Sequence, residues 1–207
     1  MMVKNGILIG SEGSTAAYVF WAAGIDYTLS EAPVARQLEM IAKDQAPSCA
    51  VGYYWTADRA RSGKYTLPIF RSQPQDLVIR ADNPKVQSYH SLVALLADPS
   101  VNLVLRNGNS YGPSVDALLL RAKARIKRPP ENSHGRLKMV LAGMEDGTLF
   151  TREEAELQIQ QFGDEGKALQ VKHFSDTPPG EPSYLYCSNS VGDALINKVN
   201  EALKKRH

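Results

Sequence analysis

The chain has 207 residues, of which 43% are hydrophobic and 22% charged, and its formal net charge at pH 7 is +2. This length allows one large domain or two small ones, and the composition is that of an ordinary globular protein. The near-neutral charge gives no footprint for nucleic acid or an anionic membrane, and two cysteines exclude a disulfide scaffold and a four-cysteine zinc site.

Strand and helix patterns alternate in the first part of the chain. Residues 25–29 alternate apolar and polar side chains and predict a strand, and residues 33–43 predict a helix with one apolar face. Two strands are expected at 49–53 and 76–80. This alternation favours an α/β fold with largely parallel strands.

The alternation continues in the second part of the chain. Its predicted elements are a helix at 91–97, a strand at 101–105, a loop at 108–113, helices at 114–126 and 136–143, a strand at 184–187 and a helix at 190–205. Thr151 opens a further helix with capping-box spacing to Glu154. The basic run 121–128 is expected on the end of a helix, as a solvated face.

The N-terminal residues give no clear targeting signal. No run of 18 or more apolar residues occurs, so no transmembrane helix is predicted. The apolar patches within residues 1–23 are short and broken by polar residues, unlike a secretion signal. A leader removed earlier, a misplaced start and a cytoplasmic protein all stay open.

The segment most informative about function is 52–70, GYYWTADRARSGKYTLPIF. An apolar run ends in Tyr53, Tyr54 and Trp55, and a turn carrying Arg59 follows. A guanidinium presents parallel donors that match a carboxylate, and neighbouring aromatic rings strengthen such a bond by excluding water. From these residues alone, a ligand-binding Arg59 and a solvent-exposed turn arginine are equally good readings.

The segment resembles the signature of the type 2 periplasmic solute-binding proteins (extracellular solute-binding protein family 3). In that family a Thr-x-x-Arg turn precedes an apolar–Ser/Thr–x–Pro–apolar segment, and the arginine holds the ligand's carboxylate. The loop at 108–112, the strand at 185–188 and the helix at 196–203 are similar to later motifs of the family, so the resemblance covers about 25–203.

The resemblance implies a periplasmic-binding-protein-like II fold, with two α/β lobes joined by two hinge segments and the ligand in the cleft between them. Lobe I would comprise 1–81 and 183–207, and lobe II 82–182. The implied ligand-binding residues are Tyr54, Trp55, Thr56, Arg59, Phe70, Asn109, Ser110, Tyr111 and Thr151.

The loop at 108–112 has a mechanism of its own. Its glycines permit unusual backbone angles, so the amides of Asn109, Ser110 and Tyr111 could point outward at a helix N-terminus, where anions are favoured. The alternative is that the loop only caps its helix. Among the aromatic residues of the signature, Phe70 is better explained by core packing and Trp55 by ligand contact.

Three departures from the family pattern narrow the expected ligand. Tyr54 stands where a small hydroxyl residue usually assists the arginine, and Thr151 stands near the position of the acid that captures an amine. The ligand is therefore expected to carry a carboxylate without being a standard amino acid, unless Glu153 or Glu154 replaces that acid. Residues 1–18 show no match to the family's first strand.

The resemblance places Cys49 and Cys187 on neighbouring strands of one sheet, where either a long-range disulfide or two buried thiols fits. Catalytic signals are weak. The four histidines show no metal spacing, no nucleophile or nucleotide motif occurs, and the adjacent acids Glu145 and Asp146 are expected to be solvated. We therefore expect no metal and no cofactor.

These observations predict a periplasmic, monomeric solute-binding protein rather than an enzyme. It would capture a small, polar, carboxylate-bearing and amino-acid-like molecule for an ABC-type transporter, with a membrane permease or sensor as partner and no nucleic acid. One alternative is a sensory or protein-interaction module of the same fold with a degenerate cleft. A dehydratase-like enzyme is the other.

Overall fold

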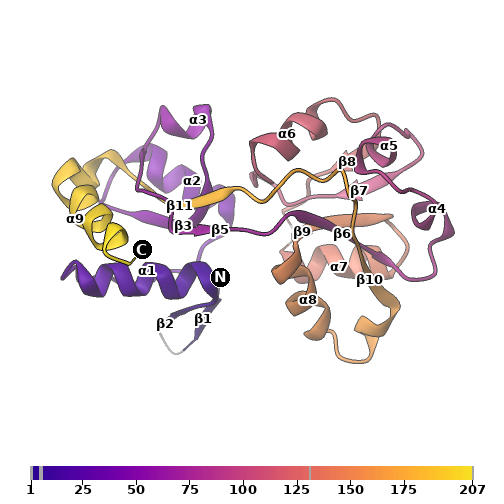
Figure 1. Cartoon of the computed structure of the whole chain (residues 1–207), viewed down its shortest axis with the longest axis horizontal. Helices are drawn as coiled ribbons and strands as arrows, with labels where there is room; N and C mark the ends of the chain where they lie inside the picture. Colours follow the sequence, from indigo (N-terminus) through magenta and orange to yellow (C-terminus); the bar gives the residue numbers. More distant parts are fainter. Residues whose placement is uncertain (1, 5–6, 131, 207) are drawn as a thin grey trace. The chain divides into compact units, whose positions relative to one another are not determined.

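The computed structural model describes residues 2–4, 7–130 and 132–206 (Figure 1). The chain forms two compact units, and it passes from one to the other twice. Unit 1 consists of Met1–Ser72 and Glu181–His207, and unit 2 consists of Gln73–Gly180. The expected lobe I ran to residue 81, but the strand at Gln75–Arg80 lies in unit 2 because it pairs with two strands there.

Unit 1 contains a small antiparallel sheet, a separate hairpin and helices. Its elements are β1 (Met2–Lys4), β2 (Ile7–Ile9), α1 (Ser11–Ala22), α2 (Val34–Lys43), β3 (Cys49–Tyr54), α3 (Ala57–Ala60), β4 (Lys64–Tyr65), β5 (Phe70–Arg71), β11 (Pro182–Cys187), the 3-10 turn η2 (Asn189–Val191) and α9 (Gly192–Lys204). The sheet has the order β3–β11–β4, with β5 also paired to β11. The C-terminal segment therefore completes the sheet of unit 1.

The two faces of this sheet bury different side chains, because successive strand residues point to opposite faces. Leu185 and Cys187 pack with α1 and α9, whereas Tyr186 between them packs with α2. Helix α2 contributes Val34 and Ile41, as its predicted apolar face requires. The sheet is thus covered by helices on both faces.

A disulfide joins Cys49 of β3 to Cys187 of β11. The two residues lie directly opposite one another in the antiparallel pair. Of the two alternatives that the sequence left open, the structure has the disulfide rather than two thiols. It ties strands 138 positions apart within unit 1.

Unit 2 is built on a five-stranded sheet of order β10–β6–β9–β7–β8. Its elements are β6 (Gln75–Arg80), α4 (Pro84–Gln87), α5 (Leu92–Leu96), β7 (Asn102–Val104), α6 (Pro113–Leu120), β8 (Arg125–Lys127), α7 (Ser133–Leu141), β9 (Gly147–Thr151), α8 (Arg152–Gln160), the 3-10 turn η1 (Glu165–Ala168) and β10 (Leu169–Lys172). Strand β7 is parallel to β8 and β9, whereas β6 is antiparallel to β9 and β10. The prediction of largely parallel strands is wrong, because alternation along the chain does not fix which strands become neighbours.

Buried residues of the unit 2 sheet alternate between two cores. Leu77 and Ile79 face a cluster formed with α4, α5 and α6, and Val78 faces a cluster formed with α7 and α8. The sheet is the middle layer of three. The carboxyl ends of the parallel strands β7, β8 and β9 meet at one edge, which is where α/β sheets place their ligand sites.

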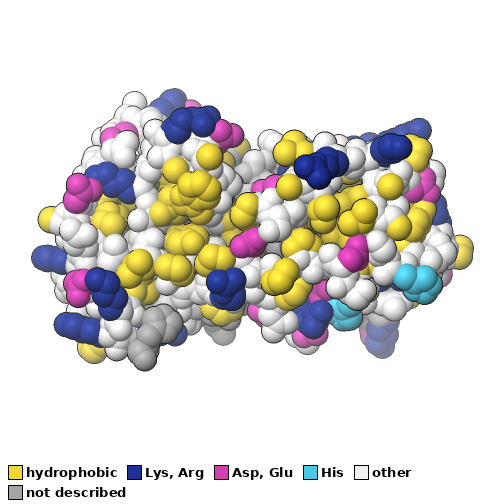
Figure 2. All heavy atoms as spheres, turned by 45° about the horizontal axis from the view of Figure 1, so that its top comes forward, with side chains coloured by type: hydrophobic (Ala, Val, Ile, Leu, Met, Phe, Trp, Pro, Cys, Tyr) yellow, Lys and Arg dark blue, Asp and Glu magenta, His cyan; other side chains and the backbone are white. Residues whose placement is uncertain are grey.

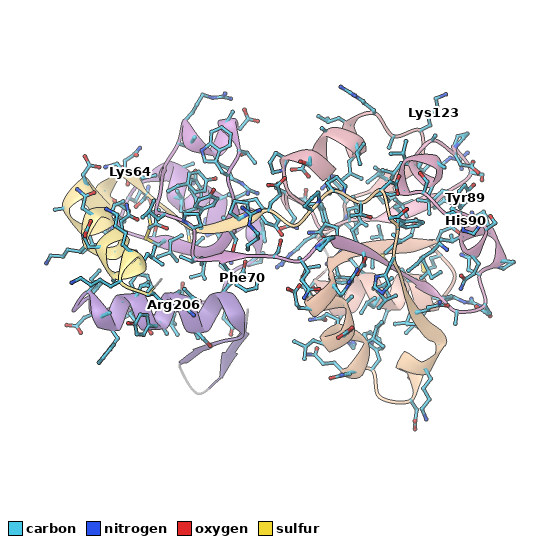
Figure 3. The ribbon with its side chains drawn as sticks, in the orientation of Figure 1. Lys64, Phe70, Tyr89, His90, Lys123 and Arg206 are labelled. Atoms are coloured by element: carbon cyan, nitrogen blue, oxygen red, sulfur yellow. A yellow bond between two sulfur atoms is a disulfide. The ribbon has the colours of Figure 1, made fainter. Side chains whose placement is uncertain are left out.

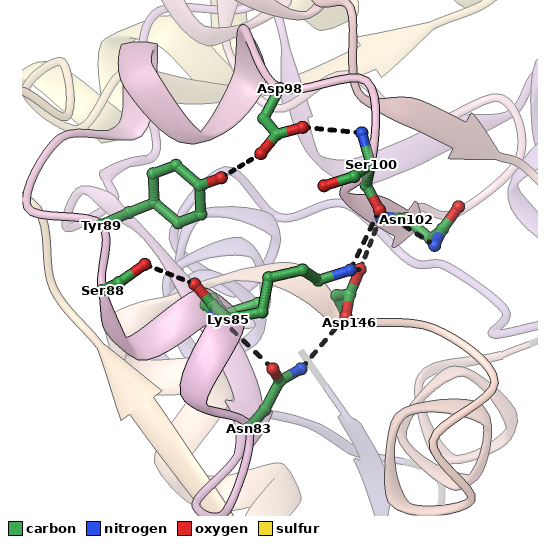
Figure 4. Close-up of polar contacts among 9 residues, drawn as sticks. Asn83, Lys85, Ser88, Tyr89, Asp98, Ser100, Asn102 and Asp146 are labelled. Atoms are coloured by element: carbon green, nitrogen blue, oxygen red, sulfur yellow. Dashed lines mark hydrogen bonds and ion pairs between the residues drawn. The ribbon is translucent and has the colours of Figure 1, made fainter.

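A polar cluster holds the start of β7 to the turn before β9 (Figure 4). Asp146 accepts hydrogen bonds from the Lys85 ammonium (2.5 Å), the Asn102 amide (2.8 Å) and the Asn83 side chain (3.1 Å). Burial raises the pKa of Asp146, but these hydrogen bonds outweigh it and the pKa is lowered. The expectation that Glu145 and Asp146 are solvated is wrong, since Glu145 is only 3% exposed.

The predicted strand at 25–29 is also wrong. These residues follow α1, a helix that no sequence pattern predicted, and they run as irregular backbone. Ile25 and Leu29 pack against the core between α1 and α9, which explains their apolar spacing without strand pairing.

The basic run at 121–128 is not a helix end. Helix α6 ends at Leu120, and Arg125–Lys127 form β8 at the edge of the sheet. The partly buried Ile126 lies between two exposed basic residues, and charged residues on an edge strand hinder further strand pairing. Among the described residues, no helix has both the length and the apolar character needed to cross a bilayer.

Candidate functional site

Arg59 lies just beyond the carboxyl end of β3, where a short turn fixes its backbone. Thr56 caps α3 by accepting a hydrogen bond from the Arg59 amide (3.2 Å). The Arg59 guanidinium donates back to the carbonyl of Tyr54 (3.0 Å). The Thr-x-x-Arg spacing therefore works as a local device: the threonine sets the turn, and the turn returns the arginine side chain to the strand end.

Aromatic rings surround this guanidinium. The Arg59 Cζ lies 5.0 Å from the centroid of the Tyr53 ring, within cation–π range. Tyr186 donates its hydroxyl to the Arg59 carbonyl (2.9 Å), and its ring stacks on that of Tyr65 at 4.8 Å. Burial raises the pKa of Tyr65, while the charge of Arg59 acts in the opposite direction. Arg59 is thus half-buried and held in place.

Hydrophobic side chains are also visible on the face of unit 1 shown in Figure 2, in the part that holds α3 and β11. Trp55 is 48% exposed, next to the arginine turn. The backbone carbonyl of Tyr54 accepts a hydrogen bond from the Arg59 guanidinium, and the Tyr54 hydroxyl donates one to the Ser72 hydroxyl (2.8 Å). Phe70 is different: it packs against the core between α1 and α9 (Figure 3), whereas the Tyr53 ring belongs to the cluster with α2. Core packing, which the sequence favours for Phe70, is thus confirmed, whereas its role in ligand binding stays a prediction.

In unit 2, donors of the loop at 108–112 form hydrogen bonds within the chain. Asp116 of α6 accepts hydrogen bonds from the Ser110 hydroxyl and from the Tyr111 amide (2.9 Å). The Asn109 amide donates to the carbonyl of Arg106 (3.3 Å). The expectation that the amides of Asn109 and Tyr111 point outward is therefore wrong, because the Asp116 carboxylate, four residues into the helix, lies where an anion would bind.

Thr151 and its neighbours are likewise engaged inside unit 2. Thr151 caps α8 by accepting from the Glu154 amide (3.3 Å), which confirms the predicted cap. Glu153 accepts from the Gln73 amide (3.3 Å), and Glu154 from the Ser133 hydroxyl (3.4 Å). The two acids proposed as amine partners thus already hold contacts within their unit.

The sequence did not draw attention to two charged groups of unit 2. Asp76 is 1% exposed, and its Oδ2 lies 2.9 Å from the Arg152 Nε and 2.8 Å from the His173 Nδ1. Arg136 of α7 is 3% exposed and has no carboxylate within 4.0 Å among the described residues. Nothing in the sequence marks Arg136, because its burial depends on the sheet beneath it. In the part of the chain that the structure describes, no three His, Cys, Asp or Glu side chains are grouped to hold a metal ion.

Comparison with known proteins gives matches through structure alone. No family model matches the chain, and neither does any curated protein sequence. Three similar solved structures are an ancestral arginine-binding protein, the arginine-, lysine-, histidine-binding protein ArtJ from Geobacillus stearothermophilus, and AncCDT-1, an ancestral amino-acid-binding protein described as a precursor of cyclohexadienyl dehydratase.

Each of the three is 18% identical to this chain, and the TM-scores are 0.76, 0.77 and 0.72 respectively. The matches cover 99%, 98% and 99% of this chain and 85%, 82% and 82% of the other chains. Likeness at this identity establishes the fold. The chain has the type 2 periplasmic-binding-protein fold that its sequence predicts.

Proposed function

We propose that this protein is a solute-binding protein that captures a small carboxylate-bearing molecule. The observation that carries the proposal is the setting of Arg59, a half-buried guanidinium held by Thr56 and the Tyr54 carbonyl and stacked on Tyr53. A preset fork of donors beside aromatic rings binds a planar carboxylate with little loss of side-chain entropy. Trp55, nearly half exposed beside the turn, is the proposed apolar contact.

The similar structures support this role. Two of those described are named as binding arginine, and AncCDT-1 is named as binding amino acids. By analogy we infer an extracytoplasmic location and delivery of the solute to an ABC-type importer or a sensor. The missing acid at Thr151 still separates this chain from proteins that grip an α-amino group, so the ligand is proposed to be a carboxylate without a required amine.

Two other functions keep a specific observation in their favour. The donors of Ser110 and Tyr111 are satisfied by Asp116, as in a module that signals through a protein partner without a ligand. The likeness to AncCDT-1, described as the precursor of a dehydratase, favours an enzyme acting on a carboxylated ring. Turnover of such a compound would support the enzyme, and silence across all compounds would support the module.

The test is a thermal-shift panel of free amino acids, keto acids, dicarboxylates and aromatic carboxylates. We expect one chemical class to raise the melting temperature of the natural protein, and Arg59→Gln to abolish the shift. Arg61→Gln is the matched control, because Arg61 lies two residues further on and its guanidinium is exposed and paired with Asp58. An equal shift in Arg59→Gln would refute the role of Arg59.

A further inference from the structure

Three arginines of unit 2 lie near the buried side chain of Tyr111. Arg106 follows β7, Arg128 follows β8, and Arg136 lies in the first turn of α7. The Arg106 amide donates to the Tyr111 hydroxyl (2.8 Å), and the Arg128 Cζ lies 6.0 Å from the Tyr111 ring centroid. Burial raises the pKa of Tyr111, while the charges of Arg136 and Arg128 oppose it. The group thus gathers at the carboxyl ends of two parallel strands.

Arg136 is the unusual member of the group. Its guanidinium donates to the Thr148 hydroxyl (2.7 Å) and lies 4.5 Å from the Phe150 ring centroid. Its Nε is buried and has no hydrogen-bond partner among the described residues. Burial lowers the pKa of Arg136, yet a guanidinium stays protonated in proteins. A charge that is buried in this way is normally paired, because removing it from water is costly.

The other two arginines also have no acidic partner in the part of the chain that the structure describes. Arg128 is exposed and donates to the carbonyls of Arg106 (3.3 Å) and Asn109 (3.4 Å), and neither Arg106 nor Arg128 forms an ion pair with any residue that the structure describes. Carbonyl oxygens satisfy donors but do not neutralise a cation.

Two acids lie near this group and do not neutralise it. Asp116 uses its two oxygens on the Ser110 hydroxyl and the Tyr111 amide. Glu154 interacts electrostatically with Arg136, but the two side chains form no ion pair within 4.0 Å. The Glu154 carboxylate accepts a hydrogen bond from the Ser133 hydroxyl instead. Among the residues that the structure describes, none of the three arginines forms an ion pair with a carboxylate.

We infer that Arg106, Arg128 and Arg136 form a subsite for an anionic oxygen-acid group, either a carboxylate or a phosphate. Arg106 and Arg128 contact the anion, and the buried Arg136 supplies charge from beneath and positions the group.

The test uses two simple probes, inorganic phosphate and succinate, each titrated by calorimetry into the natural protein at constant ionic strength. Arg136→Met keeps an unbranched apolar stem and removes the charge, and Arg128→Gln removes the charge of an exposed residue. We expect Arg128→Gln to weaken binding of the preferred probe by about 10- to 100-fold, the usual effect of losing a charge-assisted hydrogen bond. Arg136→Met should also weaken binding, because it removes a positive charge that lies beneath the anion. Preference for phosphate or for succinate identifies which acid group the subsite takes.

Arg125→Gln is the matched control, since Arg125 lies at the opposite end of β8 and is also exposed. It should bind both probes as the natural protein does. Without probe, Arg136→Met should be at least as stable as the natural protein, because it removes a buried charge that lacks an acid partner. No binding of either probe, or equal binding by Arg136→Met and Arg128→Gln, would overturn the subsite.

The same titration separates this subsite from the proposed function. Arg59→Gln should bind phosphate or succinate at the subsite unchanged, because Arg59 belongs to unit 1. Failure of the subsite with an intact Arg59-dependent thermal shift would leave the carboxylate-binding role standing. Arginine-dependent binding of a probe at the subsite without an Arg59-dependent thermal shift would refute the carboxylate-binding role of Arg59 and support the subsite.

Discussion

Reducing the disulfide between Cys49 and Cys187 should cost much of the stability of unit 1. The bond closes a separation of 138 positions. If the whole chain unfolds together, chain entropy gives a loss of about 5 kcal/mol at 25 °C for a loop of this length. The figure depends on which part of the chain unfolds, because the loop contains all of unit 2.

A second value follows if unit 1 unfolds while unit 2 stays folded. The flexible part of the loop then shrinks to the segments 49–72 and 181–187, about 31 residues, and the same relation gives about 4 kcal/mol. The expected loss is therefore about 4 to 5 kcal/mol, which is a large share of the stability of an ordinary domain.

Urea unfolding followed by circular dichroism, with and without a phosphine reductant, measures this loss. The reduced natural protein keeps both sulfur atoms, so no cavity is added, and the double variant Cys49→Ala with Cys187→Ala checks that the reductant acts only on this bond. The double variant should be unaffected by reductant. A loss below about 1 kcal/mol in the reduced natural protein would refute the loop-entropy reasoning.

Three further changes test the fold. Asp146→Asn removes the charge that accepts three hydrogen bonds and should lower the free energy of unfolding by about 1.5 to 3 kcal/mol in urea; an unchanged midpoint would contradict this. Gly63→Ala should lower the free energy of unfolding, because a Cβ at Gly63 would lie 2.6 Å from the backbone carbonyl oxygen of Cys187; an unchanged midpoint would refute the clash. Burial raises the pKa of Asp176, but hydrogen bonds from Ser91 and the first turn of α5 outweigh burial, so the pKa in the folded state is lowered. The ionised Asp176 therefore stabilises the fold at neutral pH, and this stabilisation is lost as the pH falls below about 4. Asp176→Asn should accordingly flatten the fall in stability between pH 5 and pH 3, and an identical pH profile would sink the argument.

The elements with strong periodic patterns are those that the sequence predicts correctly. Helices α2 and α9 have apolar residues on one face over about three turns, and β3, β6 and β11 are continuous runs with apolar residues. Short strands escaped prediction because their partners define them. Strand β10, Leu169–Lys172, pairs with β6 from almost a hundred positions earlier, and no local pattern reveals that pairing.

The candidate site divides in the same way. The turn around Arg59 could be predicted, because the Thr56 cap and the return of the guanidinium to the Tyr54 carbonyl are local contacts. The side on which Phe70 packs and the burial of Arg136 could not, since each depends on which helix covers a given face of a sheet. The prediction for the loop at 108–112 failed for a different reason: the Asp116 carboxylate, one helical turn away, binds the donors of the loop.

Capture of a small solute's carboxylate by Arg59 can be measured directly by calorimetric titration of the best compound from the thermal-shift panel. We expect binding by the natural protein and by Arg61→Gln, with the affinity of Arg59→Gln lower by about 10- to 100-fold. Equal affinity in Arg59→Gln, or no binding of any carboxylate by the natural protein, would contradict it.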